Sequence, residues 1–96
     1  MALDNQLANQ FGAAVSDARF VGDNAEKKYG ELRSTHEAYG VLAEEFGELL
    51  DAIRSNDVNA IRAEAVDVAA VAIRLATACE KCYHDLSSEF ASRSGF

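Results

Sequence analysis

Four acidic residues of this chain form two pairs whose spacing suits a divalent cation. Glu45 and Glu48 are three residues apart, and so are Glu64 and Asp67. Two residues at this spacing share one face of a helix, so each pair would direct both carboxylates to the same side. Mg²⁺ and Mn²⁺ prefer oxygen ligands in octahedral geometry, and Mg²⁺ usually keeps water or phosphate oxygens in its shell. The two pairs therefore predict a cation site, provided that their helices face each other.

The second acidic pair lies in the most apolar stretch of the chain, EAVDVAAVAIR at 64–74. On a helical projection, Glu64 falls in the middle of an apolar face and Asp67 falls at its edge. A buried carboxylate without a partner is strongly unfavourable, so Glu64 needs a cation or a basic side chain. We expect a metal ion. The alternative is a buried ion pair with one of three arginines, Arg33, Arg54 or Arg62.

Apolar residues recur at helical spacing along most of the chain, which predicts an all-α fold. We expect one helix at residues 3–21, a second at about 35–55, and a third from Val58 to at least Cys82. The polar stretch 22–35 predicts a loop with room for one helical turn. The tail, 87–96, is weakly helical at its start. The expected architecture is a bundle of about four helices, built on a hairpin.

Capping residues indicate where these helices begin. Ser34 and Glu37 match the capping box S-x-x-E at the start of the second helix. The stretch RSNDVN ends that helix, and Asn56 or Asp57 is expected to cap the third. A turn this short predicts that the second and third helices form an antiparallel hairpin, which would bring the two acidic pairs together.

The composition restricts the possible partners and locations. The 96 residues suffice for one domain, 1–96, and the net charge is −7. Such a charge argues against a nucleic-acid polymer or an anionic membrane as a direct partner. No run is long enough to span a bilayer, and the N-terminus lacks the pattern of a signal peptide, so a cytoplasmic location is expected. Cys79 and Cys82 lie late in a helix, which disfavours a redox or zinc role.

The third predicted helix is apolar on two sides. Val66 and Ala70 project away from the face that carries Val68 and Leu75, and Ala69 and Ile73 lie on the same side as Val66. A helix that is apolar on both sides is buried on both sides. Because one hairpin cannot cover both faces, we expect a homo-oligomer, either a dimer or a tetramer.

The two acidic stretches also suggest a family. EEFGELLDAI followed by EAVDVAAVAI resembles the ExxE…ExxD signature of the MazG-like nucleoside triphosphate pyrophosphohydrolases, with 15 residues between the pairs. STHEAYGVLAEEFGELLDAIR resembles the short, single-domain MazG-like proteins of phages and mobile gene cassettes. The resemblance covers residues 27–75. One departure is Val71, where some relatives carry an aromatic residue.

The resemblance implies an activity and a set of ligands. It implies that Mg²⁺, or Mn²⁺, is bound by the four acids of the signature, Glu45, Glu48, Glu64 and Asp67. It also implies hydrolysis of (deoxy)nucleoside triphosphates to a nucleoside monophosphate and pyrophosphate, in nucleotide-pool house-cleaning. Glu44 and Glu45 are the expected catalytic carboxylates, although the helical projection directs Glu44 away from the core.

Four basic residues are candidates for binding the substrate. Arg74 and Lys81 follow Asp67 at intervals of seven and share its stripe, so they would meet the phosphates or form a solvated stripe. Lys28 and His36 lie near the start of the second helix and are further candidates. The rival class is a non-catalytic helical interaction module, whose acids would form ion pairs.

Overall fold

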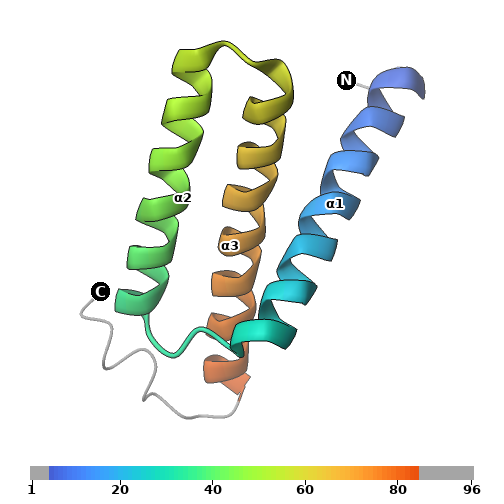
Figure 1. Cartoon of the computed structure of the whole chain (residues 1–96). Coiled ribbons are helices and arrows are strands. Elements are labelled where there is room, and N and C mark those ends of the chain that lie inside the picture. Colours follow the sequence, from blue (N-terminus) through green and yellow to red (C-terminus); the bar gives the residue numbers. More distant parts are fainter. Residues whose placement is uncertain (1–4, 85–96) are drawn as a thin grey trace.

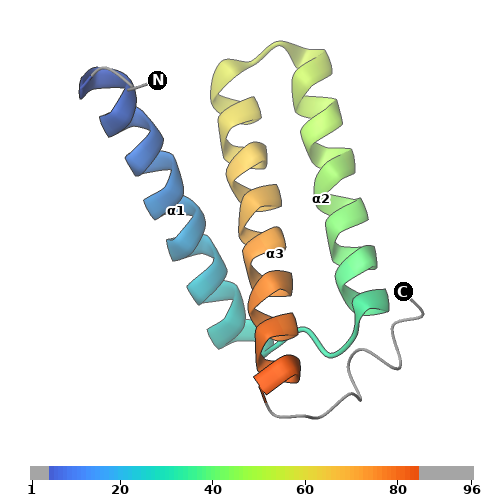
Figure 2. The ribbon, with the colours of Figure 1, turned by 180° about the vertical axis from the view of Figure 1, so that it is seen from behind.

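The computed structural model describes residues 5–84, which form three helices: α1 (Asn5–Tyr29), α2 (Thr35–Ser55) and α3 (Val58–His84). α3 lies between the other two and packs against both (Figure 1), and the view from behind shows the same order (Figure 2). Within residues 5–84, α1 does not pack against α2, and there is no strand. The all-α prediction is confirmed. The weakly helical tail, 87–96, lies outside the described residues, and a fourth helix is not confirmed.

The start of α2 follows the predicted cap. The Ser34 hydroxyl accepts a hydrogen bond from the backbone N–H of Glu37 at 3.1 Å. The Glu37 carboxylate reaches back by one residue more than in a standard capping box and accepts from the backbone N–H of Arg33 at 3.3 Å. The observed range of α2 agrees with the predicted one.

The turn between α2 and α3 uses two adjacent polar residues in different ways. Asn56 adopts the left-handed conformation, with φ of 59°, and ends α2. Asp57 caps α3, because its carboxylate accepts from the backbone N–H groups of Asn59 and Ala60 at 3.0 and 3.3 Å. Of the two residues proposed as the cap of α3, Asp57 has that role. The predicted hairpin is thereby confirmed.

The predicted loop at 22–35 is wrong over most of its length, because α1 continues to Tyr29. Gly22 lies buried where α1 crosses α3, and a Cβ at this position would be 3.7 Å from the carbonyl oxygen of Ala70. The residues that follow include good helix formers, of which Lys27 and Lys28 are exposed. The helix ends at Gly30, where φ is +80°, a conformation that favours glycine.

An ion pair fastens the end of α1 to α3. The buried Arg74 places its Nε 2.8 Å from Oε2 of Glu26 and donates a second hydrogen bond to the carbonyl of Gly30 at 3.1 Å. Removing one partner of a buried pair costs about 3–5 kcal/mol, so Arg74 holds α1 in this position. Lys81 reinforces the same region, with its Nζ 3.0 Å from both carboxylate oxygens of Glu31.

The second apolar face of α3 is covered within the chain. Val66 and Ala70 are buried, and Ala70 lies under Gly22 of α1. The expectation that a single chain leaves this face open is therefore wrong for these two residues, because α1 is long enough to cross it. Ile73, on the same side, stays 45% exposed. Among the described residues, no helix is both long and apolar enough to cross a bilayer.

Candidate metal centre

Three glutamates from α2 and α3 converge where the two helices face each other. One carboxylate oxygen from each of Glu45, Glu48 and Glu64 lies within 4.8 Å of the other two. Glu45 and Glu64 are half-buried, and Glu48 is exposed. We call these residues the three-glutamate cluster. The antiparallel hairpin thus places together carboxylates that the sequence separates by as many as 19 positions.

Two oxygens of the cluster lack a partner. Oε2 of Glu45 and Oε2 of Glu64 are buried, and neither forms a hydrogen bond with any residue in the described range. A buried carboxylate oxygen that accepts no hydrogen bond is costly, since it has lost its contact with water. Two such atoms from facing helices fit a site that binds a divalent cation.

The proposed ion pair between Glu64 and an arginine is not seen. Arg62 pairs instead with Asp17 of α1 at 2.9 Å. Arg54 lies 3.9 Å from Asp51 on its own helix. Arg33 forms no ion pair with any residue of the described part of the chain, and it donates to Glu37 through its backbone N–H.

The electrostatics of the cluster favour a bound cation. Burial, together with the neighbouring charges of Glu48, Asp67 and Glu64, raises the pKa of Glu45 from its usual 4.5 to about 7. Burial, followed by the charges of Glu48 and Asp67, also raises the pKa of Glu64. Burial and the charge of Glu48 raise the pKa of Asp67. A hard divalent cation would relieve this repulsion, and carboxylate oxygens are the ligands that it prefers.

A groove of about 530 Å³ adjoins the cluster. Glu44, Glu45 and Asp67 line one end of it. α3 forms its floor, and α1 and α2 form its walls, so the groove exists only because α1 continues beyond residue 21. Its volume is in the range of small-molecule sites. Glu44 is exposed and also lines the groove.

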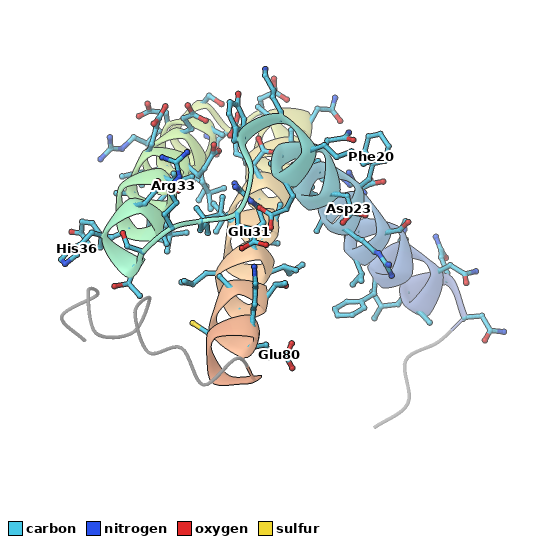
Figure 3. All side chains as sticks on the ribbon, turned by 90° about the horizontal axis from the view of Figure 1, so that it is seen from below. Phe20, Asp23, Glu31, Arg33, His36 and Glu80 are labelled. Atoms are coloured by element: carbon cyan, nitrogen blue, oxygen red, sulfur yellow. The ribbon has the colours of Figure 1, made fainter. Side chains whose placement is uncertain are left out.

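The four basic residues predicted to bind substrate are either paired within the chain or exposed. Arg74 lines the groove but is engaged by Glu26, and Lys81 is engaged by Glu31. His36 is exposed and points away from the other helices (Figure 3). Lys28 is exposed, with its Nζ 5.1 Å from the centroid of the Tyr29 ring. Whether any of the four contacts the substrate stays a prediction.

Three groove residues, at the end of α1 and in the segment before α2, were not predicted. Tyr29, Leu32 and Arg33 line the groove, and Leu32 is buried. These residues belong to the stretch that was predicted as a loop, so no face could be assigned to them. The stretch AEKKYG at 25–30 has helix formers followed by glycine. This pattern is the signal that could have predicted a longer first helix.

The fold and the three-glutamate cluster define an all-α protein with a candidate divalent-cation site beside a groove. A family model described as the MazG nucleotide pyrophosphohydrolase domain matches residues 33–92, which include α2, α3 and the whole cluster. The chain belongs to the MazG nucleotide pyrophosphohydrolase family, and the resemblance seen in the sequence is confirmed. Neither the curated proteins nor the solved structures gave a match.

Proposed function

We propose that this protein hydrolyses (deoxy)nucleoside triphosphates to nucleoside monophosphate and pyrophosphate, with Mg²⁺ or Mn²⁺ as cofactor. The observation that carries the proposal is the three-glutamate cluster, with its two buried, unpartnered oxygens, in a chain of the MazG family. The proposed role is house-cleaning of the nucleotide pool in the cytoplasm. A non-catalytic module whose acids form ion pairs is not favoured, because these oxygens have no basic partner within the described residues.

The acidic residues have three different tasks in this proposal. Glu45, Glu48 and Glu64 hold the cation, and Asp67 adds a carboxylate on the side of the groove. When bound, the cation neutralises phosphate charge and lowers the pKa of water bound to it. Glu44 is exposed at the acidic end of the groove and lies outside the cluster, so its carboxylate is available to orient water and accept its proton.

The proposed reaction predicts a specific first product. A panel of ribo- and deoxyribonucleoside triphosphates, incubated with protein and millimolar Mg²⁺ or Mn²⁺, should yield pyrophosphate and the monophosphate. Excess chelator should abolish the reaction, because the carboxylates alone cannot neutralise the phosphates. Products are separated by anion-exchange chromatography. Orthophosphate and diphosphate as first products would contradict cleavage between the α and β phosphates.

Exposed apolar side chains support a homodimer or homotetramer. Several large ones on the outer sides of α1 and α2 are at least 48% exposed: Phe11, Phe20, Tyr39, Phe46 and Ile53. Phe20, for example, points away from α2 and α3 (Figure 3). Many large, exposed apolar side chains on a small chain are typical of a protein that associates. Light scattering at micromolar concentration should give at least twice the chain mass of 10.3 kDa, and a monomer would contradict the proposal.

A further inference from the structure

The groove beside the three-glutamate cluster has two chemically different ends. The acidic end is lined by Glu44, Glu45 and Asp67, and the middle by Val41, Ala70 and Val71. The opposite end is lined by Tyr29, Leu32, Arg33, Glu37 and Arg74. A helix rises about 1.5 Å per residue, so Glu45 lies roughly 16 Å along α2 from its cap at Ser34. A phosphate held at the acidic end therefore lies at the other end of the groove from Arg33.

Two arginines line this opposite end, but they differ in what they can still bind. Arg74 is buried, and it donates from Nε to Glu26 and from its terminal nitrogen to the Gly30 carbonyl. Arg33 is exposed, and its guanidinium donates to no residue that the structure describes. Figure 3 shows Arg33 beside α2, apart from Glu31, which pairs with Lys81 of α3. Arg33 therefore offers a planar set of free donors to a ligand in the groove.

The neighbours of Arg33 add an acceptor and an aromatic surface. Glu37 accepts from the Arg33 backbone N–H through Oε1, which leaves its second oxygen available. Tyr29 ends α1, is largely exposed, and is one of the residues that line the groove. A planar ring beside a donor and an acceptor matches the requirements of a heteroaromatic ligand, which needs stacking and edge hydrogen bonds.

We infer that this end of the groove binds the nucleobase, and that Arg33 and Glu37 determine which base is accepted. The inference rests on the proposed function, which places the phosphates at the acidic end. Arg33 donates to a ring carbonyl, and Glu37 accepts from the ring N–H beside it. Guanine, uracil and thymine present a carbonyl next to a ring N–H, whereas adenine and cytosine do not. Tyr29 stacks on the base whatever its identity.

The selectivity is tested with steady-state kinetics on triphosphates of all five bases. The wild type should prefer guanine, uracil and thymine. Arg33→Met keeps the backbone contact to Glu37 and removes the guanidinium donors. It should therefore lower kcat/KM for the preferred bases by about 10–100-fold, mainly by raising KM, and change kcat/KM for adenine and cytosine little. The matched control is Arg54→Met, an exposed arginine on α2 outside the groove lining, which should leave kinetics unchanged.

Tyr29 is tested in the same assay. Tyr29→Leu should raise KM for every base, and Tyr29→Phe should restore it, because stacking needs the ring and not the hydroxyl. An unchanged KM in Tyr29→Leu would contradict a stacking role for Tyr29.

Inorganic tripolyphosphate, used as a competitive inhibitor, tests whether Arg33 contacts the phosphates instead of the base. Arg33→Met should leave its inhibition constant unchanged. If tripolyphosphate binding weakens as much as nucleotide binding does, Arg33 contacts phosphate and the base assignment is wrong. Equal loss for all five bases, or no loss, would overturn it as well.

Binding without turnover separates this inference from the proposed function. Guanosine and uridine monophosphates, titrated by NMR, should perturb the wild type more than Arg33→Met, whether or not any triphosphate is hydrolysed. Triphosphate hydrolysis without base preference would leave the proposed function intact and refute the base subsite.

Discussion

Glu64→Gln is expected to lower kcat/KM for triphosphate hydrolysis by at least about 100-fold and to remove most of the stabilisation that Mg²⁺ provides. Glu64 supplies one of the three converging carboxylates, and its buried Oε2 has no partner in the described range. Glutamine keeps the shape of the side chain but lacks the charge that holds a divalent cation. A cation that binds only the folded state at 100 times its Kd stabilises it by about 2.7 kcal/mol.

Thermal melts of wild type and Glu64→Gln, in chelator and in millimolar Mg²⁺ or Mn²⁺, measure this effect. In chelator the variant should melt higher than wild type, because one repelling charge is gone. The matched control is Glu80→Gln, an exposed glutamate near the end of α3 (Figure 3) and 16 positions after Glu64 on the same helix. A variant that melts lower than wild type in chelator would favour an ion pair at Glu64. A variant that responds to metal as wild type does would show that Glu64 is not a ligand.

The metal-free protein is expected to be more stable near pH 5 than near pH 8. Burial and neighbouring charges raise the pKa of Glu45 to about 7 in the folded state, against a usual value of 4.5. Between these two values the folded state binds more protons than the unfolded state, so stability falls as the pH rises and the full penalty is present above pH 7. Because solvent reaches part of the side chain, the contribution is about 1–2 kcal/mol, or about 5–10 °C in Tm.

The contribution of Glu45 is isolated by comparing variants across pH in the presence of chelator. Glu45→Gln should lose most of the fall in Tm between pH 5 and pH 8 and should melt above wild type at pH 8. Glu80→Gln should follow wild type. Saturating Mg²⁺ should reduce the dependence of the wild-type Tm on pH above pH 7, since the cation stabilises the ionised cluster. A Glu45→Gln profile parallel to that of wild type would contradict the raised pKa.

Much of the α2–α3 hairpin was predictable because its signals are local. Ser34 and Asp57 cap the helices that follow them, and both act on backbone N–H groups two or three residues away. The i,i+3 spacing of Glu45 and Glu48 needs only helical geometry to place both on one face. Once the turn at Asn56 makes the hairpin antiparallel, Glu64 has to face this pair. The three converging carboxylates therefore followed from short-range rules.

The packing of α1 was not predictable from local signals, and the groove depends on it. Gly22 weakens a helix prediction, yet α1 continues through it and crosses α3 at Ala70, where it buries part of the second face of α3. Arg74 and Glu26 are 48 residues apart, so no periodicity within one helix could pair them. That ion pair occupies Nε of Arg74, whereas the guanidinium of Arg33 keeps free donors at the far end of the groove. Contacts between distant segments determine which arginine is paired and which is free. Each of these contacts depends on the position of a whole helix.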